Sequence, residues 1–178
     1  YKDVIAGSYY YFSGSPVSQP NMGSEFNKKV VQYLEFKNDK MSHMGMPLPA
    51  GKIRAYQRAL GGGQEFIGES RIDHTAKDEK VNVLIGNAFD IVGERRQTNF
   101  KVLVPNHVYA ESFEIKVRNH KDTDVTVKVP ETLYRWSDWT IDASSHPFTK
   151  KDSRHIEYSV KVPRNGETVI TYTVRYSW

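Results

Sequence analysis

The sequence predicts an all-β protein built as an antiparallel β-sandwich. Aromatic residues make up 12% of the chain, with 11 tyrosines and 8 phenylalanines, and they lie among Val, Ile and Thr, which suit strands. From about residue 30 onward, short stretches alternate apolar and polar side chains between turn-forming residues. No long window shows the 3.6-residue apolar stripe of a helix. Strands with one apolar face bury it by stacking sheet on sheet.

The first half contains five stretches of strand character, with one clear hairpin. Gly61, Gly62 and Gly63 form a run that costs too much backbone entropy inside an element, so we expect a hairpin tip there. The segment SGSPVSQPNMGS, residues 13–24, is rich in Pro, Gly and Ser and predicts a long mobile loop. The expected strands are YYYF (9–12), VVQYLEF (30–36), KIRAYQRA (52–59), EFIGESRI (65–72) and KVNVLIG (80–86).

The second half contains four clearer strands. FEIKV (113–117) and VTVKV (125–129) alternate cleanly and predict a hairpin with the polar loop HKDTD. IEYSVKV (156–162) and VITYTVRYSW (169–178) flank Asn165-Gly166, a dipeptide typical of two-residue hairpin turns. We therefore expect these last two strands to pair antiparallel.

The charge-rich segment GERRQT, residues 93–98, is the expected domain boundary. It divides the chain into an N-terminal β-sandwich lobe, residues 1–95, and a C-terminal immunoglobulin-like β-sandwich, residues 96–178, with about seven strands. The alternative is one extended sandwich with continuous sheets.

Composition excludes several classes of protein. The net charge is +4 and the pI near 9.1, but the basic residues are scattered among acids, which indicates a solvated mixed surface and no nucleic-acid partner. Cysteine is absent, which removes disulfides, thiolate metal sites and cysteine nucleophiles. No apolar run approaches the roughly 20 residues that span a bilayer. The chain opens on Tyr1 without an apolar signal segment, so we interpret it as a fragment of a larger protein.

The stretch RIDHT, residues 71–75, places an acid beside a histidine. Successive side chains of a strand point to opposite faces, so Asp73 and His74 do not form a base and its orienting partner. We expect them to end a strand at a turn.

A metal or catalytic site has no local signature in the sequence. The six histidines show neither HxH nor HxxxH spacing, and motifs for nucleotide binding or a serine nucleophile are absent. We therefore predict no catalytic residue, no metal and no cofactor. A candidate polar cluster comprises Asp73, His74, Arg118, His120 and His146. A metal site would require tertiary folding to bring Asp73, His120, His146 and Asp152 together at one end of the sandwich, which no local spacing predicts.

The aromatic group around WSDW is the strongest binding feature, because flat apolar rings stack on sugars or bases. Tyr134, Trp136 and Trp139 are the candidate ligand-binding residues, and Trp178 adds to them. Sandwiches commonly bury a Trp between their sheets, and Trp139 suits that role. Trp136 is interpreted either as a core residue or as the tip of a loop.

Several stretches together resemble a known family. They are GMPLPAGKIRAYQ, FIGESRIDHT, IGNAFDIVGERRQTNF, VRNHKDTDVTVKVPE, SSHPFTKKD and the closing VITYTVRYSW. In order along residues 46–178, they resemble the C-terminal region of the DUF4139 family, to which mucoidy-inhibitor-like proteins are also similar. The resemblance implies an uncharacterised, exported or envelope-associated protein with further domains upstream, and a periplasmic, cell-envelope or extracellular location. It implies no catalytic residue.

These observations favour a non-catalytic interaction or assembly module of a larger envelope-associated or secreted protein. Its partners would be other regions of the full-length protein, or envelope proteins, bound at sheet edges and loop tips. The alternative is a carbohydrate-binding module that binds glycans through Trp136 and Tyr134. A metal-dependent hydrolase is the third hypothesis.

Overall fold

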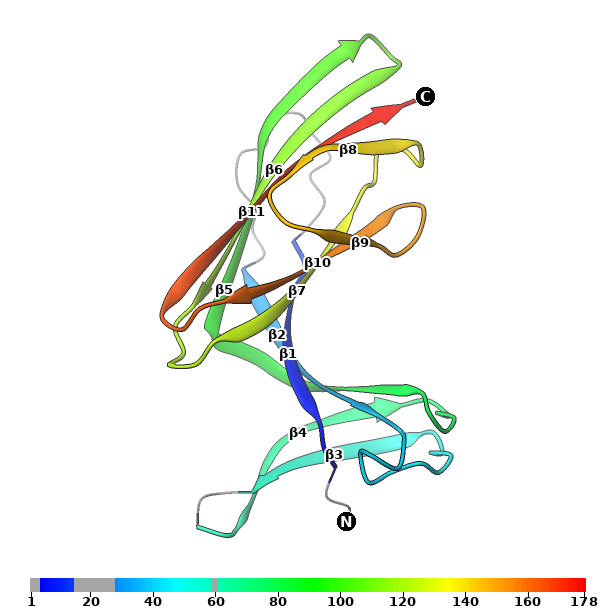
Figure 1. Cartoon of the computed structure of the whole chain (residues 1–178), viewed down its shortest axis with the longest axis vertical. Helices are drawn as coiled ribbons and strands as arrows, with labels where there is room; N and C mark the ends of the chain where they lie inside the picture. Colours follow the sequence, from blue (N-terminus) through cyan, green and yellow to red (C-terminus); the bar gives the residue numbers. More distant parts are fainter. Residues whose placement is uncertain (1–3, 15–27, 59–60) are drawn as a thin grey trace. The chain divides into compact units, whose positions relative to one another are not determined.

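The protein is all-β, as predicted. The computed structural model describes residues 4–14, 28–58 and 61–178, and these form strands and turns without a helix (Figure 1). The predicted loop at residues 13–24 lies almost wholly outside the described residues. The strands are β1 (Gly7–Phe12), β2 (Lys29–Lys37), β3 (Gly51–Arg58), β4 (Gln64–Ile72), β5 (Lys80–Val104), β6 (Val108–Asn119), β7 (Val125–Thr132), β8 (Trp139–Ser144), β9 (Phe148–Lys150), β10 (His155–Val162) and β11 (Gly166–Ser177).

The chain folds into two compact units. The first contains Tyr1–Tyr10 and Val31–Asn87, and the second contains Tyr11–Val30 and Ala88–Trp178. The boundary expected at residues 95 and 96 falls inside β5, a strand of 25 residues without a break. Buried residues, among them Arg95 and Gln97, alternate with more exposed ones along the segment that was expected to be the boundary, so this charge-rich segment is part of a sheet.

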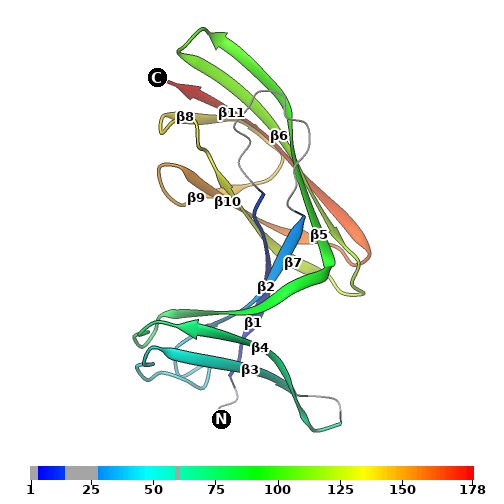
Figure 2. The same ribbon diagram turned by 180° about the vertical axis from the view of Figure 1, so that it is seen from behind.

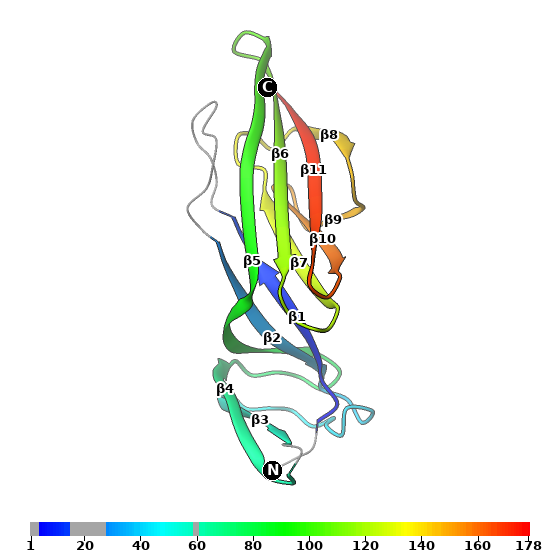
Figure 3. The ribbon, with the colours of Figure 1, turned by 90° about the vertical axis from the view of Figure 1, so that its left-hand side faces the viewer.

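The second unit is a sandwich with an apolar interior. One layer contains the later part of β5 followed by β6, β11 and β8, and the other contains β7, β10 and β9. Figures 2 and 3 show these two layers from behind and from the side. Alternate residues of β6, β7, β10 and β11 are buried between the layers, as period-two patterning requires. They include Phe113, Ile115, Val127, Tyr158 and Tyr172.

The strand partners in the second unit differ from those predicted. β6 pairs with β5 and β11, and β7 pairs with β10, so β6 and β7 are not a hairpin. β10 and β11 are not a hairpin either, since β11 pairs with β6 and β8. Each of these two pairs is joined by an arch that crosses from one layer to the other.

The two arches are fixed to each other by hydrogen bonds. Asn165, with a positive φ of 49°, donates its backbone N–H to Lys121 O at 3.0 Å. Buried Asn119 donates from Nδ2 to Val162 O and Pro163 O at 3.3 and 3.0 Å. The Asn-Gly turn was therefore recognised correctly as a turn, but it connects layers and not neighbouring strands.

The first unit contains the predicted hairpin of β3 and β4, which pair antiparallel. Its core is small: Phe36, Val81 and Val83 are buried, and the apolar side chains around them are only partly buried. β4 crosses close to β5 at Gly68, where an added Cβ would lie 2.8 Å from Ile85 Cα. Glycine is required at this crossing because the two backbones are in contact.

Candidate functional site

An exposed apolar surface lies at one end of the second unit. We call it the aromatic end surface and define it as Phe100, Val102, Tyr109, Trp136 and Trp178. The β5–β6 hairpin continues past the ends of the other strands (Figure 3). Its register places Phe100 opposite Glu111 and Val102 opposite Tyr109, so these side chains share the face that is buried further along the strands. Beyond the opposing layer, that apolar face reaches the surface.

The aromatic rings of this surface are in contact. The ring centroids of Tyr109 and Trp178 are 4.7 Å apart at 89°, and those of Phe100 and Tyr109 are 5.6 Å apart. Trp136, on the loop between β7 and β8, lies 6.1 Å from Trp178 at an angle of 47°. His107 and Trp178 are joined by a backbone hydrogen bond of 3.0 Å. Segments far apart in sequence are therefore held together in one aromatic group.

Much of this surface is open to solvent. Val102, Trp136 and Trp178 are 52%, 45% and 43% exposed, and Leu103 and Val104 at the adjacent hairpin tip are 51% and 45% exposed. Single exposed apolar residues are ordinary, whereas contiguous exposed patches usually mark interaction sites.

An ion pair anchors the loop that carries Trp136. Arg135 Nη2 lies 2.6 Å from Oε1 of Glu111, which is fully buried on β6, although the angle is not that of a well-aligned hydrogen bond. The Arg135 guanidinium also lies 4.9 Å from the Phe100 ring centre and 5.1 Å from that of Tyr134. Burial alone would lower the pKa of Arg135, but Glu111 outweighs it and raises the pKa. Arg135 is therefore held as a cation beneath the aromatic end surface.

Further inside, a second ion pair lies between the layers. Arg95 Nε donates to both oxygens of Glu131 at 3.0 and 2.8 Å, and the Tyr172 hydroxyl donates to the same carboxylate. The Arg95 guanidinium stacks 4.1 Å over Phe113. Burial raises the pKa of Tyr172, and the Glu131 charge raises it further. A neighbouring bond of 2.8 Å joins Gln97 Nε2 to Glu111, so polar side chains fill this end of the interior.

The three predicted ligand-binding residues differ in exposure and in their contacts. Trp136 is exposed at a loop tip and belongs to the aromatic end surface. Tyr134 is half-buried, and burial raises its pKa to about 12. Trp139 is also half-buried and lies opposite Tyr176 on β11; its Nε1 donates to Ser153 O at 2.7 Å and its ring contacts Lys150.

The candidate polar cluster is distributed over both units. Asp73 and His74 belong to the first unit, and Arg118, His120 and His146 belong to the second. Arg118 pairs with Glu94 at 2.6 Å. Asn119, next to His120, lies opposite Gly166 on β11, whereas Ser144, near His146, lies opposite Tyr172. Gly166 and Tyr172 are six residues apart along β11, which is roughly 20 Å. The parts of the sheet next to His120 and His146 are therefore separated by a similar distance.

The RIDHT stretch ends β4 at Ile72. Thr75 Oγ1 donates to Asp73 O at 2.9 Å, and Ala50 N donates to His74 Nδ1 at 3.2 Å. The side chains of Asp73 and His74 are exposed; Asp73 takes part in a local turn contact, whereas His74 contacts the segment that precedes β3. Within the described ranges, no group of three or more His, Asp or Glu side chains is arranged to hold a metal ion.

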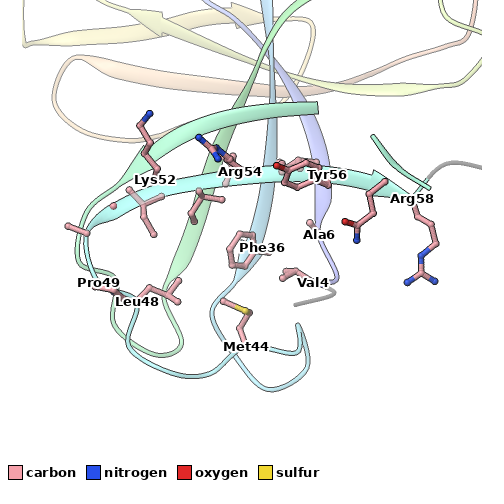
Figure 4. Close-up of a pocket in the computed structure, with 18 residues that line it drawn as sticks. Val4, Ala6, Phe36, Met44, Leu48, Pro49, Lys52, Arg54, Tyr56 and Arg58 are labelled. Atoms are coloured by element: carbon pink, nitrogen blue, oxygen red, sulfur yellow. The ribbon is translucent and has the colours of Figure 1, made fainter. Parts of the chain in front are cut away.

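A cavity of about 970 Å³ lies in the first unit, beneath β3 (Figure 4). Phe36, Met44 and Leu48 line it on one side, and Ile53 lines it from β3. Lys52 and Arg54 alternate with Ile53 along β3 and pair with Glu69 of β4 at 2.7 and 2.8 Å. These pairs hold the pKa of Glu69 at about 2, mainly through the hydrogen bond from Lys52.

Sequence reasoning missed Phe100, Tyr109, Glu111 and Arg135. One signal was present: Glu111 stands two residues before Phe113 and is in phase with Ile115 and Val117, so it occupies an inward-facing position. A charged residue in the apolar phase of a strand indicates a buried polar partner.

Among the described residues there is also no helix of the length and apolar character needed to cross a membrane. Comparison of the chain with protein-family models, with curated proteins and with solved structures gave no match.

Proposed function

We propose that this chain is a non-catalytic interaction module that binds a protein partner through the aromatic end surface. The observation that carries the proposal is the series of neighbouring, partly exposed apolar side chains that runs from Trp136 through Trp178 and Tyr109 to Val102, which lies opposite Tyr109 in the β5–β6 hairpin. Trp, Tyr and Arg are the residues most enriched at the centres of protein interfaces.

Several contacts also hold the residues of this surface in place. Arg135 is fixed by the buried Glu111 carboxylate, and Trp178 is fixed by His107 and Tyr109. Side chains that are already held by such contacts have less conformational entropy to lose on binding, which favours affinity. The family resemblance supports placing the module in a larger exported or envelope-associated protein, whose other regions or neighbours supply the partner.

The test is site-specific photocrosslinking in the full-length protein in its own cells. A photoreactive phenylalanine at Leu103 or at Trp136 is expected to give one discrete protein adduct. Lys161, exposed on β10, is the matched control position and is expected to give none. Adducts at all three positions, or at none, would contradict the proposal.

A carbohydrate-binding module is the second candidate, favoured by the exposed Trp136. Sugar rings stack best on flat platforms bordered by hydrogen-bonding groups, whereas Trp136 and Trp178 are tilted by 47° and the adjacent hairpin tip is aliphatic. Affinity gels containing a panel of polysaccharides separate the candidates: retardation abolished by Trp136→Ala would favour the glycan, and an unretarded protein would favour the protein partner.

A further inference from the structure

We infer that the interior of the second unit binds one ordered water molecule, held by Glu111, Tyr134 and Arg135 beneath the aromatic end surface. The site goes beyond the proposed function, because it lies in the interior and needs no partner.

The inference starts from a group of buried polar atoms that the protein leaves unpaired. Glu111 Oε2, the Tyr134 hydroxyl, Arg135 Nε and Arg135 Nη2 are all buried, and none has a hydrogen-bond partner among the described residues. The Glu111 side chain itself is 0% exposed. A buried polar atom without a partner is costly, and native proteins supply the partner from another protein group or from ordered water.

The contacts of Glu111 show which of its oxygens is open to a further donor. Arg135 Nη2 lies 2.6 Å from Oε1 with a poor angle, and Gln97 Nε2 donates to the same Oε1 at 2.8 Å. Oε2 is therefore the carboxylate oxygen that still needs a donor, while Arg135 Nε and Nη2 still need acceptors.

The Tyr134 hydroxyl belongs to the same group. The Arg135 guanidinium carbon lies 5.1 Å from the centre of the Tyr134 ring. Burial raises the pKa of Tyr134, the charge of Glu111 raises it further, and the charge of Arg135 opposes both effects. The phenol is therefore within the influence of both members of the ion pair.

The chemistry of these atoms matches water. Arg135 can only donate, Glu111 can only accept, and the Tyr134 hydroxyl can do either. A water molecule that accepts from Arg135 and donates to Glu111 and Tyr134 would make at least the roughly three hydrogen bonds typical of a buried water. A cation would be repelled by Arg135 and an anion by Glu111, so a small neutral molecule suits this pair.

The first test is a high-resolution crystal structure of the chain. One peak of electron density is expected within about 3.2 Å of Glu111 Oε2, the Tyr134 hydroxyl and an Arg135 nitrogen. A direct hydrogen bond from Tyr134 to Glu111 Oε2, with no peak beside it, would overturn the inference.

Oxygen-17 relaxation dispersion, which counts long-lived waters in solution, is the second test. Glu111→Leu with Arg135→Met removes three of the four unpaired atoms and is expected to lower the count by one water. The matched control is Arg95→Met with Glu131→Leu, which removes the other buried ion pair, whose carboxylate already has protein donors. Its count is expected to stay the same. An unchanged count in the first variant, or an equal loss in the control, would contradict the site.

A milder variant keeps the inference testable if the double variant does not fold. Tyr134→Phe removes one partner of the water and keeps both charges, so it is expected to shorten the residence time of the water roughly fivefold, as for the loss of one hydrogen bond. Tyr158→Phe is the control, because its hydroxyl already has a partner in Ser144 Oγ at 3.3 Å, and it is expected to leave the residence time unchanged. A residence time in Tyr134→Phe equal to that of the original chain would overturn the assignment.

Discussion

Arg95 and Glu131 form an ion pair inside the second unit, with both carboxylate oxygens within 3.0 Å of Arg95 Nε and with side chains 3% and 1% exposed. Removing one partner leaves the other charge buried and unpaired. Arg95→Met is therefore expected to lower the free energy of unfolding by about 3 to 5 kcal/mol, measured by urea denaturation.

The neighbouring residue provides a matched control. Arg96 lies on the outer face of the same strand and pairs with Glu114 at 2.8 Å. Arg96→Met is expected to cost less than about 1 kcal/mol, because exposed pairs are screened by water. The double variant Arg95→Met with Glu131→Leu is expected to recover much of the loss. An equal loss of unfolding free energy in Arg95→Met and Arg96→Met would contradict the role of burial in the effect of the Arg95–Glu131 pair.

The Glu111–Arg135 pair is predicted to position Trp136. In a background with Trp139→Phe and Trp178→Phe, the fluorescence reports Trp136 alone. Arg135→Met is expected to increase acrylamide quenching of this fluorescence, because the loop loses its anchor. Arg175→Met breaks the Arg175–Asp142 pair of 3.1 Å elsewhere on the sheet and is the control. Unchanged quenching in Arg135→Met would argue against positioning.

Gly68→Ala is predicted to destabilise the first unit. The new Cβ would lie 2.8 Å from Ile85 Cα and 3.0 Å from Ile85 O, and overpacking of this kind costs about 1 to 3 kcal/mol. At Gly51, in the same hairpin, an added Cβ meets nothing within 4 Å. Gly51→Ala is expected to be neutral or stabilising by up to about 1 kcal/mol. Similar urea midpoints for the two variants would contradict the close crossing of β4 and β5.

Stability is predicted to fall at alkaline pH. Burial raises the pKa of Tyr134 and of Tyr158 to about 12, above the value of about 10 for an unfolded tyrosine. Their contribution is therefore fully present below about pH 10 and is lost as the pH rises to about 12. The free energy of unfolding from pH 9 to 12 measures this effect. Tyr158→Phe is expected to flatten the decline, and a decline as steep as that of the original chain would exclude Tyr158 as a contributor.

The fold class was predictable because period-two alternation identifies strands and their inward faces. Phe113, Ile115 and Val117 face the interior as expected, and so do Val125, Val127 and Val129. The partners were not predictable, because alternation is the same whether a strand turns back beside its predecessor or crosses to the opposite layer. Asn165-Gly166 indicated a turn, but turn chemistry alone does not distinguish a hairpin from an arch.

The candidate site was predictable only in part. The sequence left Trp136 open between a core position and a loop tip, and the structure places it on the loop between β7 and β8 with 45% of its surface exposed. Tyr109 and Phe100 could not be associated with it, since their contact with Trp178 depends on the pairing of β5, β6 and β11. The cavity of the first unit depends on how the β3–β4 hairpin lies over Phe36, which no local pattern encodes.

The arches also affect how quickly the chain folds. β11 lies between β6 and β8 in the sheet, and its first residue follows the end of β6 by almost fifty residues. Neither β6 nor β8 can complete this pairing before β11 is available. Pairing of segments so distant in sequence closes a long loop, which costs conformational entropy before stabilising contacts form. Folding is therefore expected on a timescale of about milliseconds to seconds. During synthesis, the edges of β6 and β8 remain open until β11 has left the ribosome, and in that interval another chain can pair with them.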